Sequence, residues 1–498
     1  MNKKAILQSF SKVYSNRYRV YPSSVRSEGN NFFFMVRDDK RKYLVVIGSL
    51  SLCEKFEGDP LVDLKVNGNK LTMRIAYINH HNLVLLRRIF PHLSPSTCSA
   101  RTSFGTGDRL GIATPAHVQA FECKDIFPIL AQQSVRETSR TGRDWQGVLD
   151  DAIWGCFEAG YQGPFGADAD HVKRIEDLRG AVDCGYTMFT VDPSDFVRDD
   201  VFKLSEEKKD KLYRSLSERK ELERLYLGKS YLIAGERLEF DEKSLREVAL
   251  IYLEALKHTV KCYKFLDDYK RGDFDFEVSV DETSTPTSPL AHVFIVQELR
   301  RNKVDFQSLA LRFIGEWQKG IDYIGDVEEF VRELSLHVAI TRMFGGYKLS
   351  LHSGSDKFLI YPIFAQKTDS FFHIKTAGTS YLEAIKVIAR KNPSLYREIH
   401  HFALKNFEKD RASYYVTTDL SRIPEVDEIP DDRLEDLFKK QDSRQLIHIT
   451  YGSVLSAKDG EGNFLFRDRI YKTLFENEDE HYREVSAHIK RHLELLEI

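Results

Sequence analysis

Short apolar segments alternate with helical segments from about residue 98 onward, and eight of the apolar segments lead into polar, ionisable residues. They span 101–104, 127–133, 165–170, 187–192, 274–280, 309–314, 348–352 and 371–375. Alternation of strand and helix predicts parallel strands in βαβ units. Eight such units predict an α/β protein of the (β/α)8, or TIM-type, barrel class.

The segments on either side of this pattern predict two appendages. Residues 1–97 predict a small α+β unit, with a hairpin at 31–36 and 42–47, a third strand at 71–78 and a helix at 82–90. We place the catalytic barrel at 98–425. Residues 196–240 are too many for one crossover connection and predict an insertion after the fourth strand. Residues 426–498 predict a helical C-terminal extension packed on the barrel.

Composition excludes several classes of protein. The chain has 498 residues, of which 42% are hydrophobic and 30% charged, so a large core is feasible. The net charge of -3 offers no electrostatic case for a nucleic-acid partner. No run approaches the ~18 apolar residues of a membrane helix, and the start lacks the apolar stretch of a signal peptide. The six cysteines form no C-x-x-C pair, which is typical of a reduced, cytoplasmic protein.

Ionisable residues are concentrated at the predicted strand ends, where the active sites of such barrels lie. The alternation in 275–281 places Glu277 on a face that points into the barrel, and His373 and Lys375 share a face in the same way. Buried charges in this number are costly unless they are paired or bind a metal. The strand-end residues of interest are Asp170, His171, Asp192, Glu277, Asp281, Glu282, Arg312, His352, Asp356, Lys357, His373 and Lys375.

Three of these residues, His171, His352 and His373, suggest a metal site. Neutral imidazole suits Zn²⁺ and other first-row divalent ions. Each histidine alone is better explained as a hydrogen-bonded core residue. Their joint appearance at strand ends favours a divalent metal ion, with Zn²⁺, Ni²⁺ and Mn²⁺ as the candidates.

A glycine-rich loop follows the first predicted barrel strand. Gly105-x-Gly107-x-x-x-Gly111 has one residue too many for a dinucleotide motif, so a turn that brings backbone amides near an anion is favoured over NAD binding. Arg101, Asp108 and Arg109 lie beside it. They are consistent either with a clamp on a substrate carboxylate or with a salt-bridged loop.

Two further residues have more than one interpretation. Gln133 lies in the run Gln132, Gln133, Ser134, Arg136 and Glu137, which could contact sugar hydroxyls or simply cap a helix. Lys375 could form an ion pair, bind an anion or form a Schiff base. Anion binding is favoured, because neighbouring carboxylates would keep the pKa of Lys375 high.

Eight segments together resemble the tagaturonate epimerase family, bacterial enzymes of hexuronate breakdown. They are SFGTGDRLG (103–111), AQQSVRE (131–137), FGADADHVK (165–173), TMFTVDPSD (187–195), FEVSVDE (276–282), RFIGEW (312–317), SLHSGSDK (350–357) and HIKTAGT (373–379). The resemblance implies a metal-dependent barrel enzyme that interconverts D-tagaturonate and D-fructuronate. Some relatives also accept fructose and tagatose, so the partner is a small sugar acid or ketose.

The resemblance also implies roles for individual residues. Asp170 would be a base beside the metal ligand His171, Glu277 the opposing acid, and His352 and His373 the remaining ligands. We expect the other polar groups to bind substrate: Arg101, Asp108, Arg109, Gln133, Asp192, Asp281, Glu282, Arg312, Asp356, Lys357 and Lys375.

The two uronates differ at a carbon whose C–H bond the ketone does not acidify, so plain enolisation does not invert it. Without a nicotinamide site, retro-aldol cleavage followed by re-addition is the predicted route. The alternatives are a metal-dependent aldolase or ketose isomerase, and a non-catalytic sugar-binding barrel.

Overall fold

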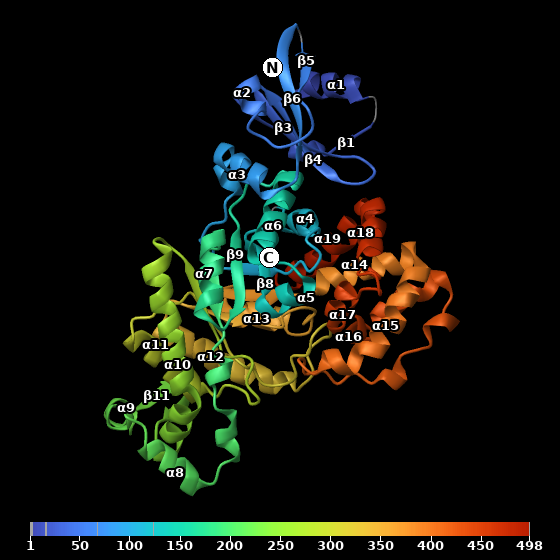
Figure 1. Ribbon diagram of the computed structural model, residues 1–498. Coiled ribbons are helices and arrows are strands. Elements are labelled where there is room, and N and C mark those ends of the chain that lie inside the picture. Colours follow the sequence, from blue (N-terminus) through green and yellow to red (C-terminus); the bar gives the residue numbers. More distant parts are fainter. Residues whose placement is uncertain (1–2, 15–16, 67, 123, 498) are drawn as a thin grey trace.

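Eight parallel strands form a closed barrel at the centre of the molecule, and this confirms the predicted fold class (Figure 1). The structure is a computed structural model that describes residues 3–14, 17–66, 68–122 and 124–497. Each strand overlaps one predicted segment, and the last strand closes the barrel by pairing with the first. The strands are β7 (Ser103–Thr106), β8 (Phe127–Ser134), β9 (Gly166–Val172), β10 (Met188–Val191), β13 (Asp275–Ser279), β14 (Ser308–Ala310), β15 (Lys348–Leu351) and β16 (Phe372–Thr376).

Helices surround the barrel because alternate strand residues are apolar and point outward. Phe276 and Val278 of β13, for example, are fully buried in the core that also holds residues of the helices outside the barrel. The surrounding helices are α4 (Thr114–Phe121), α5 (Val135–Thr141), α6 (Trp145–Ala159), α7 (Ile175–Cys184), α10 (Glu242–Lys270), α11 (Pro289–Arg301), α12 (Val327–Phe344), α13 (Tyr361–Thr368) and α14 (Thr379–Lys391).

Residues 196–240 lie between β10 and α10, at the lower left of Figure 1. They include α8 (Glu206–Arg214), α9 (Arg219–Tyr226) and a small antiparallel hairpin of β11 (Ser230–Ile233) and β12 (Glu236–Glu239). The aromatic ring of Tyr231 in this hairpin packs near Phe344 of α12. The segment is therefore attached to the outside of the barrel.

The N-terminal unit is an antiparallel sheet in the order β1-β3-β4-β6-β5, with β2 paired to β3. Sequence analysis predicted β3, β4, β6 and α3 but missed β1, β2 and β5. The first two are too short for a period-two pattern to be visible. The elements are α1 (Lys3–Tyr14), β1 (Arg19–Val20), β2 (Arg26–Glu28), β3 (Asn31–Arg37), β4 (Lys42–Gly48), α2 (Leu50–Cys53), β5 (Val62–Val66), β6 (Asn69–Tyr77) and α3 (His80–Ile89).

The C-terminal helices build a second hydrophobic core around α14. The predicted boundary at residue 426 falls inside this core, because α15 already contributes to it. The last helix, α19, returns to the barrel, where Ile489 and Leu493 join the main core. These helices are α15 (Pro393–Arg411), α16 (Gln441–Ile449), α17 (Tyr451–Ser456), α18 (Arg467–Glu476) and α19 (Glu478–Leu495).

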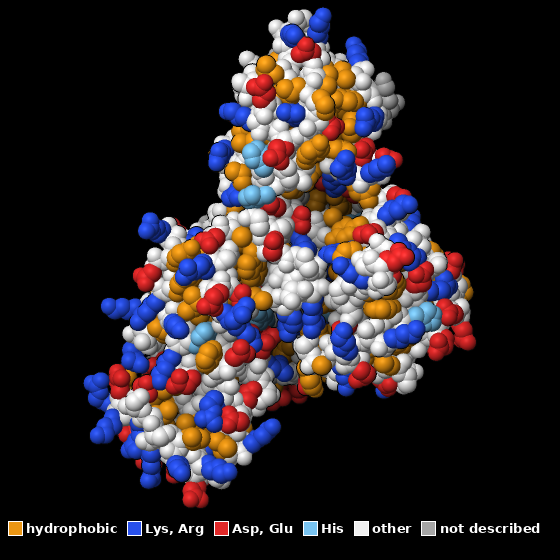
Figure 2. All heavy atoms as spheres, viewed as in Figure 1, with side chains coloured by type: hydrophobic (Ala, Val, Ile, Leu, Met, Phe, Trp, Pro, Cys, Tyr) orange, Lys and Arg blue, Asp and Glu red, His pale blue; other side chains and the backbone are white. Residues whose placement is uncertain are grey.

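The surface and the cysteines agree with the composition. Positive and negative side chains are mixed over the face shown in Figure 2, without a large area of one sign. The five cysteines in the described part of the chain are free thiols, and Cys123 lies outside the described residues. Among the helices formed by described residues, none combines the length and apolarity needed to cross a bilayer.

Candidate active site

Lys375 of β16 lies at the centre of a buried cluster of carboxylates inside the barrel. Its Nζ is 2.6 Å from Asp168 Oδ2, 2.7 Å from Asp170 Oδ1 and 2.9 Å from Glu277 Oε1. Burial alone would lower the pKa of Lys375, but these three carboxylates raise it well above its usual value. Lys375 is therefore a fixed ammonium ion, which suits charge binding and disfavours the free amine that a Schiff base requires.

Two histidines lie directly beside this cluster. His171, in β9, and His352, which follows β15, have ring centroids 4.9 Å apart. Nε2 of His352 is 2.6 Å from Glu277 Oε1, and its Nδ1 is 3.2 Å from Asp281 Oδ1. Nδ1 of His171 is 3.5 Å from Asp192 Oδ2. The backbone of His171 has a φ of 49°, a left-handed conformation that is uncommon outside glycine and often marks a functional site.

The electrostatic field around these imidazoles favours positive charge. Burial would lower the pKa of His171, but Asp170, Asp192 and Asp281 raise it to about 10. Burial would also lower the pKa of His352, and Asp281 and Glu277 raise it. The carboxylates respond in the opposite direction: burial would raise the pKa of Asp281, but His352, His171 and Ser279 together lower it.

The same arrangement can hold a metal ion. Ligand atoms of His171, Asp281 and His352 all lie within 4.8 Å of one another. Two imidazoles and a carboxylate are a donor set typical of Zn²⁺ and other first-row divalent ions. Nδ1 of His171 and Oδ2 of Asp192 are buried without a hydrogen-bond partner. The negative field that raises the pKa of both imidazoles stabilises a bound proton. The same field would stabilise a metal cation bound to the imidazole nitrogens in place of these protons.

His373 does not join this group, which corrects the prediction that it is a third ligand. It precedes Lys375 by two residues on β16, so it points inward one layer deeper in the barrel. Its Nδ1 lies 2.9 Å from Ser103 Oγ, and burial lowers the pKa of the ring to about 3. Asp281, predicted to bind substrate, instead lies with the two histidines.

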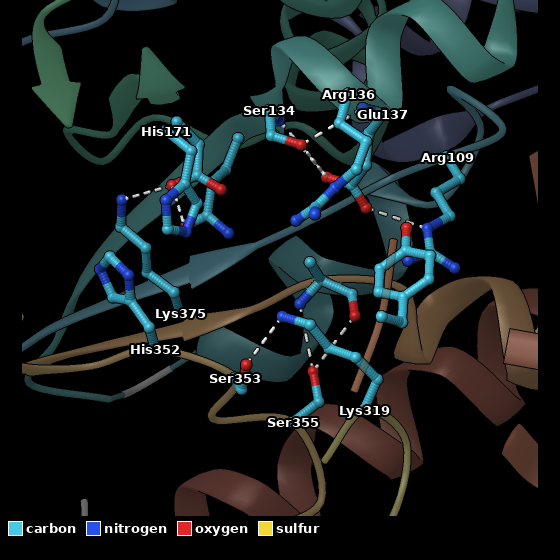
Figure 3. A pocket seen from close by; sticks show the side chains of 14 residues that line it. Arg109, Ser134, Arg136, Glu137, His171, Lys319, His352, Ser353, Ser355 and Lys375 are labelled. Atoms are coloured by element: carbon cyan, nitrogen blue, oxygen red, sulfur yellow. Dashed lines mark hydrogen bonds and ion pairs between the residues drawn. The ribbon is translucent and has the colours of Figure 1, made fainter. Parts of the chain in front are cut away.

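A polar cavity opens over the cluster and the histidines (Figure 3). Segments more than 200 residues apart contribute to its wall. Its lining residues are Arg109, Gln132, Ser134, Arg136, Glu137, Asp170, His171, Lys319, His352, Ser353, Ser355, Lys375, Ala377 and Tyr414. Sequence analysis did not raise Lys319, Ser353 or Tyr414. It left Gln132, Ser134 and Arg136 open between sugar contacts and helix capping, and it placed Ser355 at a strand end without a role.

The register of β8 explains why Gln132 belongs to the site and Gln133 does not. Gln132 pairs with Asp168, and Ser134 pairs with Asp170, so both share the inward face with these carboxylates. Gln133 pairs with Ala169 on the opposite face and does not line the cavity. If the register between β8 and β9 had been known, the alternation of inward-facing residues on β9 would have identified Gln132 and Ser134.

The three residues beside the glycine-rich loop do not converge on one point. Arg101 precedes β7 and contacts Asp369, which precedes β16, so it lies at the opposite end of the barrel. The Asp108 carboxylate accepts backbone N–H groups from residues 110, 111 and 113, which caps the loop. Arg109 reaches the cavity, but its guanidinium donates to Glu137 at 3.0 Å and to the carbonyl of His448 at 2.9 Å. These contacts support the salt-bridged loop, and the substrate clamp stays a prediction.

Asp356 and Lys357 also have structural contacts instead of lining the cavity. Asp356 Oδ2 is 2.9 Å from Arg444, and its Oδ1 is 2.8 Å from His488 of α19. Nζ of Lys357 donates to the carbonyls of Gln318 at 2.9 Å and of residue 321 at 2.6 Å. These contacts hold the C-terminal helix and a neighbouring loop against the barrel.

The remaining predicted residues surround the cavity. Glu277 does not line it, because its oxygens contact Ser308, His352 and Lys375. Glu282 and Arg312 line an adjoining cleft that shares Arg136, Lys319, His352, Ser353 and Tyr414 with the cavity. Asp192 does not line the cavity but contacts His171, which does.

A (β/α)8 barrel with imidazoles, carboxylates and an ammonium ion at the strand ends is typical of enzymes that act on small polar substrates. A family model described as tagaturonate epimerase matches residues 21–496. The chain belongs to this family and is an enzyme of the carbohydrate epimerase class, as the resemblance implied.

Two similar proteins cover almost the whole chain. A tagaturonate/fructuronate epimerase from Thermotoga maritima is 52% identical over 492 residues, which is 99% of this chain and 100% of that protein. Crystal structures of a fructuronate-tagaturonate epimerase from Cohnella laeviribosi, native and complexed with glycerol, are 40% identical with a TM-score of 0.92. The native structure and this chain cover each other over 100% of their lengths.

Proposed function

We propose that this protein interconverts D-tagaturonate and D-fructuronate. The observation that carries the proposal is the Asp170–Lys375 pair beside His171 and His352 at one wall of a polar cavity. The activity named for the relatives supports the choice of substrate, because their similarity extends over the full chain. The partner is thus a small sugar acid. Free cysteines support a cytoplasmic location.

The position of the inverted carbon restricts the chemistry. Numbered from the end nearer the ketone, the ketone is C2 and the inverted carbinol is C4. The C4–H bond is too far from the ketone to be acidified, whereas the C3–C4 bond is correctly placed for retro-aldol cleavage. Cleavage yields an enediolate from C1–C3 and an aldehyde at C4. Rotation of the aldehyde and re-addition to its other face invert C4.

Asp170 is the residue best suited to move the required proton. Burial would raise the pKa of its carboxyl, but Lys375 and the imidazoles lower it below its usual range, so it is an ionised base. Asp170 accepts the hydroxyl proton of C4 as the C3–C4 bond breaks and returns it after re-addition. The electron pair of the broken bond moves to the ketone oxygen. The ammonium of Lys375 stabilises negative charge in the cavity.

Glu277 acts by positioning in this scheme, not by proton exchange. It contacts His352, Lys375 and Ser308 at once, which holds the imidazole and the ammonium in fixed directions. His171, Asp281 and His352 would hold a divalent ion, which when bound supplies Lewis-acid charge at the ketone. Two imidazoles and a carboxylate suit Zn²⁺, Ni²⁺ and Mn²⁺.

The activity is tested by following tagaturonate by NMR with the purified protein. We expect fructuronate to appear, and we expect chelator to abolish conversion until Zn²⁺, Ni²⁺ or Mn²⁺ is added back. Absence of any fructuronate with all three ions supplied refutes the proposed activity.

The route is tested with tagaturonate that carries deuterium at C4. Retro-aldol chemistry never breaks the C4–D bond, so the product keeps the label and the rate changes little. Transient oxidation breaks that bond, so a large isotope effect or loss of label would contradict the retro-aldol route. Accumulation of the three-carbon fragments as final products would instead indicate an aldolase, and a ketose isomerase would introduce solvent deuterium next to the carbonyl.

A further inference from the structure

Four Lys and Arg side chains line the cavity, and two of them are fully engaged. The guanidinium of Arg109 is held by Glu137 and lies 3.7 Å from the ring centroid of Tyr451. Lys375 is surrounded by three carboxylates at 2.6–2.9 Å. Both cations are already paired with protein carboxylates, so neither offers an unpaired charge for the carboxylate of a substrate.

Lys319 is different because no carboxylate neutralises it. It lies in the loop between β14 and α12, and its Nζ donates to Ser353 Oγ at 2.7 Å. Within the described part of the chain, no Asp or Glu forms an ion pair with it. Ser353 has a left-handed φ of 49°, so the loop that presents its hydroxyl adopts a conformation uncommon for serine.

Arg136 faces the same space from α5 and is only weakly engaged. Its contacts with Glu282 and with the carbonyl of Ser413 are both 3.3 Å long. Its Nε is buried without a hydrogen-bond partner. Tyr414, which follows Ser413, lies beneath the guanidinium at 5.0 Å from the ring centroid. A guanidinium with free donors is well suited to a planar carboxylate.

Figure 3 shows how these groups are arranged. His171, His352 and Lys375 lie on one side of the cavity, while Lys319 and Arg136 point in from other elements. Once Arg109 is paired with Glu137, and Lys375 with its carboxylates, Lys319 remains as an unpaired positive charge among the described residues. Arg136 beside it has a single ion pair among these residues, the 3.3 Å contact with Glu282. An excess of charge in a polar, partly enclosed cavity favours a ligand with a complementary anion.

We infer that Lys319 and Arg136 form a subsite for the carboxylate of a sugar acid, and that this subsite selects acids over neutral ketoses. The inference rests on the proposed function for the identity of the acid. The carboxylate at C6 is two bonds from C4, so its capture at Lys319 and Arg136 leaves C2–C4 to face Asp170, Lys375 and the histidines. A neutral ketose has a hydroxymethyl group at C6 and lacks this contact.

The test is calorimetric binding of D-galactonate and of galactitol, which differ at the carboxylate and need no turnover. We expect Lys319→Met to weaken galactonate binding about 10- to 100-fold, the range expected for a lost hydrogen bond to a charged group, and to leave galactitol unchanged. Arg136→Gln is expected to act in the same direction. Lys439→Met is the matched control, because Lys439 is exposed and pairs with Asp436 on the surface.

Arg140→Gln separates charge binding from support of the cavity wall. Arg140 also contacts Ser413 and lies 5.0 Å from the ring centroid of Tyr414, but it does not line the cavity. If Arg140→Gln weakens galactonate as much as Arg136→Gln, Arg136 supports the wall and its part of the inference is overturned. The subsite is overturned if Lys319→Met weakens the binding of galactonate and of galactitol equally. It is also overturned if the unaltered protein binds galactonate no more tightly than galactitol.

Turnover of tagaturonate and tagatose by the same variants distinguishes the two proposals. If the unaltered protein converts tagaturonate and Lys319→Met does so equally well, the subsite fails while the proposed function stands. If Lys319→Met loses galactonate binding but the unaltered protein converts no keto-uronate, the subsite stands and the proposed function fails. Selective loss of tagaturonate turnover, with tagatose unaffected, supports both.

Discussion

Replacement of Lys375 by methionine tests the central cluster of the site. Asp168, Asp170 and Glu277 are all buried, and among the described residues Lys375 is the only lysine or arginine that contacts them, so the change removes their shared ammonium ion. Breaking one buried ion pair costs about 3–5 kcal/mol, because an uncompensated charge remains. Domains are typically stable by roughly 5–15 kcal/mol, so Lys375→Met is expected to fold with much of its stability lost. Turnover is expected to fall about 10²- to 10³-fold, as for loss of one group that stabilises negative charge.

Stability is measured as the apparent free energy of unfolding in urea at pH 8, and turnover by NMR under the same conditions. Lys386→Met serves as the control, because Lys386 contacts Glu383 and Glu484 but its side chain is 26% exposed. Loss of this half-buried pair is expected to cost about 1 kcal/mol or less. The reasoning is refuted if Lys375→Met unfolds within about 1 kcal/mol of the unaltered protein or keeps more than about a tenth of its turnover.

Three further predictions concern other parts of the site and fold. His171→Ala and His352→Ala should each lose the bound divalent ion in elemental analysis, whereas Asp170→Asn should keep the ion and lose turnover; unchanged metal content in both histidine variants would exclude them as ligands. Arg101→Ala lies at the opposite end of the barrel and should leave KM for tagaturonate within about twofold, since a remote surface change has little effect. Burial would lower the pKa of His488, but Glu383 and Asp356 raise it. The charged imidazole therefore stabilises the fold below about pH 6.5, the pKa of the unfolded chain. This contribution is lost as the pH rises through the higher pKa of the folded protein. His488→Gln should therefore cost roughly 1–3 kcal/mol at pH 6 and less at pH 9 in urea unfolding, and an equal cost at both pH values would contradict the ion-pair explanation.

The depth of a side chain within the barrel was not accessible from the sequence. Alternation along β16 correctly placed His373 and Lys375 on one inward face. It did not show that His373 lies a layer below the histidine pair, beside Ser103. Depth is set by the register between neighbouring strands, which forms only when the barrel closes.

The sequence also did not show whether a charged side chain already has a partner in the folded protein. Arg109 and Lys357 have the residue types that bind anions, but the carbonyls of His448 and Gln318 occupy them. Lys319 lies in a loop without a periodic pattern, and it becomes notable only because no Asp or Glu among the described residues forms an ion pair with it.

The sequence by itself determined the barrel and the strand ends that carry its chemistry, because apolar spacing and strand alternation are local properties of the chain. The resemblance of eight segments identified the family for the same reason. Tertiary structure alone decided that Asp281 joins His171 and His352, and that Tyr414 from the C-terminal region reaches the cavity. Contacts between distant segments depend on register and on the packing of whole elements, and no local pattern encodes them.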